Sequence, residues 1–187
     1  MRRGLAAALV AGAALSASPP AAGAYRTGPP AGHTGGFGEP TCTACHWGEK
    51  GAAEAIHALT VEVPASYRPG EVHQITVVLQ DPGLRAAGFQ LSARFRGGEN
   101  AGRQAGSLAA SDSTVAVVTG GSGVAYASHS AAGTTPRREG KAAWVVRWTA
   151  PREGGVVVFH AAANAANDDA SEFGDRIHVT EARTSSR

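Results

Sequence analysis

The sequence predicts an all-β protein, an immunoglobulin-like antiparallel β-sandwich that follows an irregular N-terminal segment. From Ala58 onward, short runs alternate apolar and polar residues, and this period of two is typical of strands that bury one face. Gly or Pro punctuates the gaps between the runs, as expected for turns. The chain before Ala58 has no such period and is rich in Gly, Pro and Thr, which indicates irregular structure.

Residues 1–24 have the pattern of a secretory signal peptide. A basic start is followed by an apolar run from Leu5 to Ala17 and then by Ala22-Gly23-Ala24, a cleavage site of the A-x-A kind. The run is shorter than the roughly 20 apolar residues that span a bilayer. We therefore expect this segment to be removed, the mature chain to begin at Tyr25, and the protein to be exported to the periplasm or the cell exterior without a membrane span.

Residues 25–57 contain the most informative motif of the chain, Cys42-Thr43-Ala44-Cys45-His46. The spacing Cys-x-x-Cys-His is typical of covalent attachment of a c-type haem. In such a site each thiol forms a thioether to the porphyrin, and the imidazole becomes the proximal iron ligand. We therefore predict that Cys42 and Cys45 hold one haem, that His46 binds its iron and that Trp47 packs against the porphyrin. Because the motif contains both cysteines of an exported chain, the chain has no disulfide framework that would otherwise explain them.

Two other chemistries use the same residue types. A Cys-x-x-Cys pair can be a thioredoxin-like redox dithiol, but that motif requires a strand-helix-strand setting, and the surroundings of Cys42 read as a loop. Two cysteines and a histidine can also bind zinc, but a closed structural site needs a fourth ligand, and no second Cys or His pair has ligand spacing. Both remain alternatives to the haem.

The sequence leaves several candidates for the sixth iron ligand. Methionine is excluded, because Met1 is the only one and leaves with the signal peptide. His129 is the first candidate, since it follows a predicted strand in a loop of small residues, although a structural role bonded to the backbone competes. His57 is the alternative, which a short helix predicted over residues 50–56 can fold back over the porphyrin, and His33 is the third. Another nitrogen donor, or an open position for water or a diatomic ligand, also remains.

The alternating runs predict seven or eight strands of a sandwich over residues 58–181, followed by a polar tail over 182–187. The clearest run places Phe89, Leu91, Ala93 and Phe95 on one face and Gln90, Ser92 and Arg94 on the other. The predicted strands cover 58–63, 75–79, 89–95, 114–119, 124–128, 142–148, 155–163 and 176–180.

The charge of the chain gives no reason to expect a nucleic-acid partner. Arg2 and Arg3 account for the formal net charge of +2, so the mature chain is balanced. A cluster of acidic residues suggests calcium, but it lacks the Asp-x-Asp-x-Asp-Gly order of a known loop, and we prefer a polar turn between the last two strands. The cluster comprises Asp168, Asp169, Glu172 and Asp175.

The order of these pieces resembles a bacterial group of exported proteins that join a mono-haem segment to a Reeler (reelin N-terminal-like) β-sandwich domain. The segment Tyr25 to Gly35 leading to Cys42 is similar to that group's haem lead-in. Two positions depart from the group's pattern, Phe37 and His160. The similar landmarks in the sandwich are Tyr67-Arg-Pro-Gly70, Gly88-Phe89-Gln90-Leu91, Ser128-His129-Ser130, Trp148-Thr-Ala-Pro151 and Asn164-Ala-Ala-Asn167.

The function that these observations favour is an exported mono-haem c-type cytochrome that transfers one electron to or from a redox partner protein. The alternatives are a haem-based ligand sensor with a displaceable sixth ligand, and an adhesion or protein-interaction module in which the haem is structural. The chain has neither a Gly-x-Ser-x-Gly elbow nor a His-Glu-x-x-His motif, so an electron carrier is favoured over an enzyme.

Overall fold

The computed structural model describes residues 25–48 and 58–187, and nearly all of its regular structure is β. Three single-turn 3-10 helices are present in this part of the chain, η1 (Gly36–Gly38), η2 (Cys42–Ala44) and η3 (Ala131–Gly133). The strands are β1 (Leu59–Glu62), β2 (Ser66–Tyr67), β3 (Val72–Gln80), β4 (Ala86–Phe95), β5 (Ser107–Ala110), β6 (Val115–Thr119), β7 (Ala125–His129), β8 (Lys141–Thr149), β9 (Val156–Ala166) and β10 (Arg176–Ser186).

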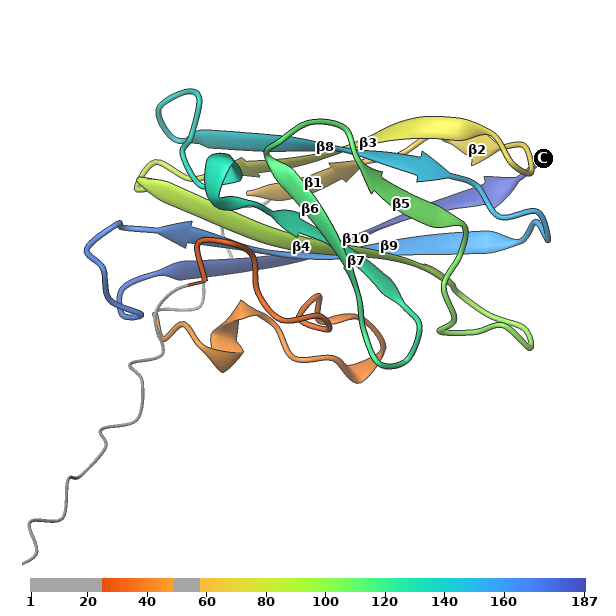
Figure 1. The fold of residues 1–187 in the computed structure, drawn as a ribbon, viewed down its shortest axis with the longest axis horizontal. Coiled ribbons are helices and arrows are strands. Elements are labelled where there is room, and N and C mark those ends of the chain that lie inside the picture. Colours follow the sequence, from red (N-terminus) through yellow and green to blue (C-terminus); the bar gives the residue numbers. More distant parts are fainter. Residues whose placement is uncertain (1–24, 49–57) are drawn as a thin grey trace, which may run out of the picture.

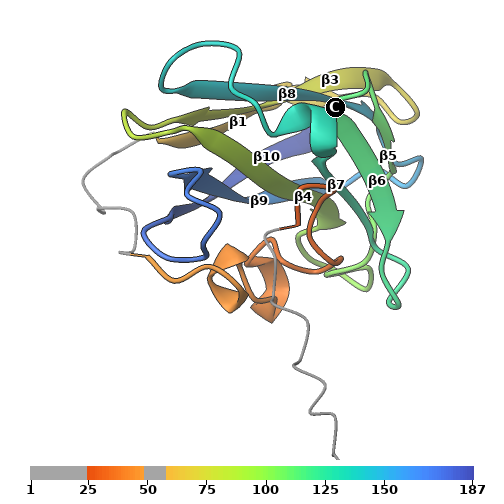
Figure 2. The ribbon, with the colours of Figure 1, turned by 60° about the vertical axis from the view of Figure 1, so that its left-hand side comes forward.

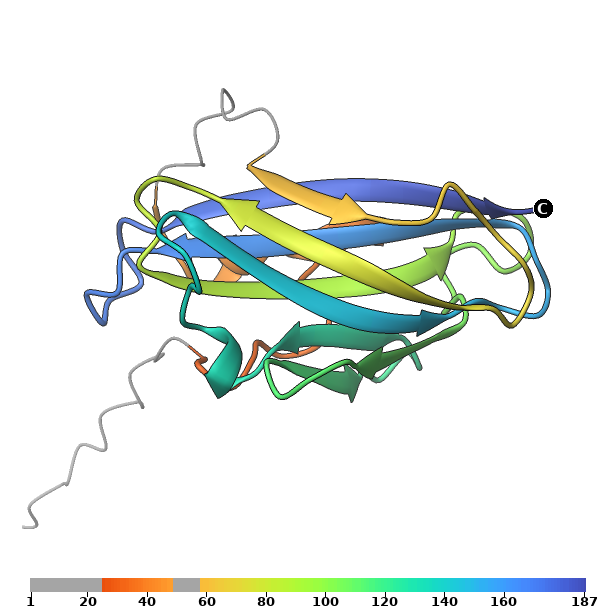
Figure 3. The same ribbon diagram turned by 90° about the horizontal axis from the view of Figure 1, so that it is seen from above.

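The strands form two sheets packed face to face, which confirms the predicted sandwich. One sheet has the order β1-β3-β8-β5 and the other the order β2-β10-β9-β4-β7-β6. Seen from above, the strands of the first sheet cross those of the second at an angle, as expected when two twisted sheets pack (Figure 3). All pairings are antiparallel except that of β2 with β10, which is parallel.

The core between the sheets comes from the apolar face of each alternating run. Trp144 and Trp148 of β8, Phe89 of β4 and Phe159 of β9 are almost fully buried there. The ring centroids of Phe89 and Trp144 lie 4.5 Å apart in a stacked arrangement, and the indole N–H of Trp144 donates to the carbonyl of Gly133 at 2.9 Å. The indole N–H of Trp148 likewise donates to the carbonyl of Ala105 at 2.9 Å, so both buried indoles are paired, as burial requires.

The structure corrects the predicted elements at three places. The last strand continues to Ser186, so residues 182–186, expected in a polar tail, instead belong to the sheet: residues 182–185 pair with β9 and Ser186 pairs with Tyr67 of β2. Two short strands, β2 and β5, were not predicted, because two to four residues are too few for a period to be recognised. The predicted helix over residues 50–56 lies outside the described residues.

Residues 25–48, here called the lead-in, cover the outer face of the six-stranded sheet. Figures 1 and 2 show this orange segment running beneath β4, β9 and β7, on the side away from the other sheet. The outward side chains of β4 are consequently buried although they are polar: Gln90 and Ser92 are inaccessible, and Arg94 is 6% exposed. The middle strands of this sheet therefore have two buried faces, and the lead-in is part of the same packed body.

Candidate haem site

The Cys-x-x-Cys-His motif is folded as a tight turn. The hydroxyl of Thr41 accepts from the N–H of Thr43 at 3.2 Å and caps η2, as Thr does at helix N-termini. The carbonyl of Cys42 then accepts from the N–H of Cys45 at 3.2 Å and from that of His46 at 3.0 Å. This turn brings both thiols and the imidazole to one side of the backbone.

The His46 ring is oriented by the carboxylate of Asp175, which directly precedes β10 and is far from His46 in the sequence. Its Nδ1–H donates to Oδ2 of Asp175 at 2.6 Å, and the amide of Asn164, on β9, donates to the same oxygen at 2.8 Å. The 3.0 Å between the two nitrogen donors follows from this shared acceptor. With Nδ1 committed in this way, Nε2 carries the lone pair that a metal ion can accept.

Asp175 is 1% exposed and remains ionised. Burial alone would raise the pKa of its carboxyl, but the hydrogen bonds from His46, from Asn164 and from the N–H of Asn167 lower that pKa below its ordinary value. A fixed negative charge therefore faces the ring of His46. This residue was predicted only as part of a polar turn.

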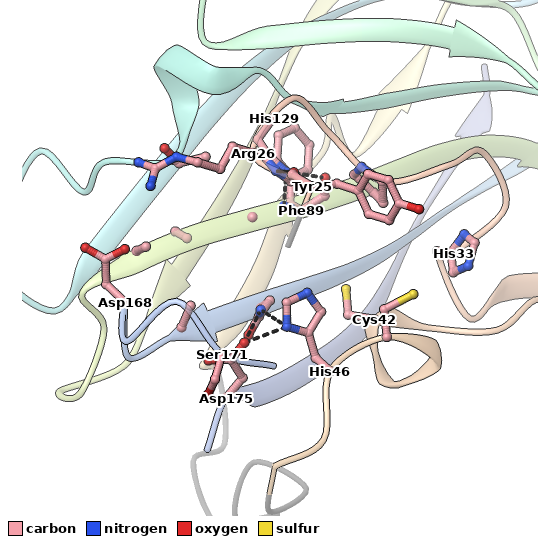
Figure 4. Close-up of a pocket in the computed structure, with 18 of the residues that line it drawn as sticks. Tyr25, Arg26, His33, Cys42, His46, Phe89, His129, Asp168, Ser171 and Asp175 are labelled. Carbon is pink, nitrogen blue, oxygen red and sulfur yellow. Dashed lines mark hydrogen bonds and ion pairs between the residues drawn. The ribbon is translucent and has the colours of Figure 1, made fainter. Parts of the chain in front are cut away.

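A cleft of about 320 Å³ joins the motif to the sheet, a volume within the range of small-molecule and cofactor sites. Cys42, Cys45 and His46 form one side, and the other side comes from β4, from His129 and from the first residues of the lead-in. Figure 4 shows His46 and Asp175 facing Tyr25, Phe89 and His129 across it. The apolar side chains of the lining are those of Pro29, Pro30, Ala86, Ala166 and Ala170; Ala87 and Phe89 also line the cleft, but their side chains belong to the core between the sheets.

The two thiols are free and half-buried. Burial raises the pKa of the Cys42 thiol to about 12. A redox dithiol of the thioredoxin kind has a lowered pKa and stands at the N-terminus of an α-helix. Cys42 has neither property, since η2 is a single 3-10 turn, so the geometry disfavours the dithiol alternative.

His129 lines the same cleft, but both of its ring nitrogens are bonded to the backbone. Nδ1 accepts from the N–H of Phe89 at 3.0 Å, and Nε2–H donates to the carbonyl of Tyr25 at 3.0 Å. Burial lowers the pKa of the ring, which therefore stays neutral at pH 7. The structure therefore shows His129 in the structural role that competed with iron ligation in the sequence analysis. Ligation by His129 would require one of these two hydrogen bonds to break.

The remaining predicted site residues lie at different distances from the cleft. His33 lines it on the side of Cys42 (Figure 4), with Nδ1–H donating to the carbonyl of Pro30 at 3.0 Å. Trp47 is 53% exposed and is absent from the lining; its ring lies 5.5 Å from that of Phe173. His57 lies outside the described residues.

The donor set of the cleft fits a covalently bound haem. The two free thiols of Cys42 and Cys45 could form the two thioether bonds of such a haem. Nδ1 of His46 is bonded to a carboxylate, which leaves its Nε2 free, and the facing wall of the cleft is largely apolar. Over residues 25–48 and 58–187, no group of three or more His, Cys, Asp or Glu side chains is arranged to hold a bare metal ion.

Fold and site together define a β-sandwich that carries a Cys-x-x-Cys-His motif on the outer face of its larger sheet. Among solved structures, the human F-spondin reeler domain is similar at 22% identity and a TM-score of 0.48, over 76% of this chain and 95% of that one. The Reelin-N domain of F-spondin is similar at 20% identity and a TM-score of 0.47, over 78% and 96%. A cohesin module of a Clostridium perfringens family 33 glycoside hydrolase is similar at 10% identity and a TM-score of 0.42, over 69% of this chain and 96% of that one.

No protein-family model and no curated protein matches the chain. In the part of the chain that the structure describes, no helix has the length and apolar character needed to cross a membrane.

Proposed function

We propose that this chain is an exported mono-haem c-type cytochrome that transfers single electrons. The observation that carries the proposal is the convergence in one cleft of Cys42, Cys45 and His46, with Nδ1 of His46 bonded to the buried carboxylate of Asp175. A bound haem supplies the redox chemistry, and the residues of this chain attach it, orient it and set the polarity around it.

The protein's own contribution is electrostatic and geometric. Asp175 and Asn164 fix the ring plane of His46, and the ionised carboxylate raises the basicity of the imidazole. The apolar wall beneath β4 excludes water from one face of the cleft. A more basic imidazole favours the ferric state, whereas exclusion of water favours the ferrous state, so the two features oppose each other in setting the potential.

The test is to express the full precursor with haem-maturation factors, then measure the intact mass and the ferric and dithionite-reduced visible spectra. We expect one covalent haem, a reversible one-electron couple, and loss of the haem in the Cys42→Ala/Cys45→Ala variant. A parent chain exported with two unmodified thiols would refute the proposal and favour the interaction module. A haem that binds carbon monoxide readily and exchanges electrons slowly would favour the sensor.

A further inference from the structure

Tyr25 is fixed at the cleft by its backbone. It lines the same cleft as Cys42, Cys45 and His46. Its carbonyl oxygen accepts two hydrogen bonds, one from Nε2–H of His129 at 3.0 Å and one from the N–H of Gly28 at 3.1 Å. The backbone nitrogen of Tyr25 is two bonds from the anchored carbonyl carbon, so it stays beside His129 and turns only about the Cα–C bond.

His129 is packed in a way that keeps it in this supporting position. The residue is 8% exposed, and its ring lies against Gly88 so closely that a Cβ there would be 2.7 Å from Cε1. Its second nitrogen is occupied by the N–H of Phe89. The ring thus has no lone pair free for the cleft, while it directs the first residue of the mature chain into it.

Signal-peptide cleavage after Ala24 converts the backbone nitrogen of Tyr25 into a primary α-amine. A neutral amine has one lone pair and is a good donor to haem iron. The alternative donor His33 lies on the side of the cleft that carries Cys42, and not opposite His46 (Figure 4). Tyr25 and His129 face His46 across the cleft (Figure 4), so a haem attached through Cys42 and Cys45 would lie between His46 and these two residues.

We propose that the α-amino nitrogen of Tyr25 is the sixth iron ligand, and that His129 is a positioning residue that holds the Tyr25 carbonyl. This inference rests on the proposed haem and on cleavage after Ala24. It explains how a chain without a mature methionine can offer a second axial ligand while the nearest histidine is fully hydrogen-bonded.

The experiment compares three precursors, each matured with haem-attachment factors. The first is the parent, and the second inserts one alanine between Ala24 and Tyr25, which moves the amine one residue away from its anchored carbonyl. The third, a matched control, replaces residues 1–24 with an unrelated signal peptide that leaves Tyr25 first. Intact mass establishes the N-terminus and the covalent haem of each product before the visible and electron paramagnetic resonance spectra are recorded.

We expect low-spin spectra that are identical for the parent and the leader-swapped control. The insertion variant should lose the low-spin bands and gain the ability to bind carbon monoxide in the ferrous form. His129→Ala should give a mixture of low-spin and high-spin iron, because it releases the carbonyl and keeps the amine. Addition of free imidazole should restore a low-spin spectrum to both variants.

An insertion variant that keeps its covalent haem and its low-spin spectrum would overturn this inference alone. A fully high-spin spectrum of His129→Ala would then identify His129 as the ligand. A fully high-spin spectrum of His33→Gln would identify His33. A high-spin parent, or a mature chain that begins at another residue, would also overturn it. A parent without covalent haem would instead overturn the proposed function, and this inference with it.

Discussion

His46 shows how one buried carboxylate determines what an imidazole can do. Asp175 accepts the Nδ1 proton at 2.6 Å and leaves the opposite nitrogen available to a metal. The two residues are 129 positions apart, and the turn before β10 is held to the motif by backbone hydrogen bonds of Trp47 with Glu172 and Gly174, at 2.7 Å and 3.1 Å.

Asp175→Asn should raise the reduction potential of the proposed haem. The substitution replaces a carboxylate with a neutral amide, so the His46 ring becomes less basic and stabilises ferric iron less. We expect a change on the order of 60 mV, the equivalent of a tenfold factor in a one-electron equilibrium. Spectroelectrochemical titration measures it. Asp169→Asn, in the exposed turn nearby, is the control, and an equal potential in parent and Asp175→Asn would contradict the role.

Phe37 and His160, the two departures from the Reeler-like pattern, contact each other. Their ring centroids lie 5.4 Å apart in an edge-to-face arrangement, and Phe37 has a positive φ of 53°. Gly36 lies against the same His160 ring, so closely that a Cβ added there would overlap it. Gly36 is therefore needed at this contact because it lacks a side chain.

Gly36→Ala should destabilise the protein by about 1–3 kcal/mol, the usual cost of overpacking. The new methyl group has to displace His160 or the backbone of the lead-in. Urea denaturation measures the change in the free energy of unfolding. Gly97→Ala serves as the control, because this exposed glycine has no positive φ and an added Cβ there meets nothing within 4 Å. Equal losses in the two variants would mean that the His160 contact is unimportant.

At the scale of elements, the lead-in is attached to β4 by a buried ion pair. Glu39 of the lead-in pairs with Arg94, whose guanidinium also donates to the hydroxyl of Tyr126 at 2.6 Å. The second carboxylate oxygen of Glu39 accepts from Thr34 at 2.5 Å. The lead-in therefore supplies partners to most polar groups on the outward face of β4, and Nε of Arg94 is the buried atom of this face that is left without one.

Glu39→Ala should destabilise the protein by about 3 kcal/mol, because it leaves the Arg94 charge buried without its partner. Hydrogen exchange should accelerate most in residues 25–48, since the substitution releases the lead-in and keeps the core between the sheets. Glu99→Ala, an exposed substitution of the same type, should have little effect. Equal hydrogen-exchange rates of residues 25–48 in Glu39→Ala and in the parent would show that other contacts hold the lead-in.

At the scale of the whole molecule, the six-stranded sheet depends on the C-terminal residues. β10 pairs with β9 from Arg176 to Ser185, and its last residues also pair with β2. The hydroxyl of Tyr67 and the N–H of Ser186 both bond to the carbonyl of Gly155, at 2.8 Å and 3.1 Å. The chain end thus closes one edge of the sandwich.

Deletion of residues 181–187 should abolish cooperative folding or lower the melting temperature by more than 10 °C. The deletion removes half of the β10 to β9 pairing and exposes the core beside Tyr67, and each kcal/mol lost costs several degrees in a domain of this size. Circular dichroism during heating measures this. Deletion of Arg187 alone is the control and removes one backbone hydrogen bond to Tyr67. Similar melting of both truncations would restore the polar-tail prediction.

Stability should fall as the pH is lowered from about 7 to 5. Burial lowers the pKa values of His129 and His160 below their ordinary value of 6.5. In this window the unfolded chain takes up protons that the folded chain does not, so each such histidine contributes up to about 1.4 kcal/mol per pH unit of destabilisation. The buried carboxyls of Asp81 and Asp175 have lowered pKa values and act only at more acidic pH.

Urea denaturation at several pH values measures this slope, and His160→Gln should make it shallower. Glutamine does not titrate, so the comparison of slopes is independent of any packing change in the variant. A parent whose free energy of unfolding is flat between pH 5 and 7 would show that neither histidine is kept neutral by the fold.

The sequence determined the sandwich, the motif and most strand positions, because these depend on local signals. Alternation along the chain places Phe89 and Leu91 inside, and Cys-x-x-Cys-His sets the spacing of Cys42, Cys45 and His46 within one turn. Tertiary structure alone decided which distant groups meet that turn. The carboxylate of Asp175, the carbonyl that fixes His129 and the ion pair under the lead-in all come from strand pairings and sheet faces, and no local period records them.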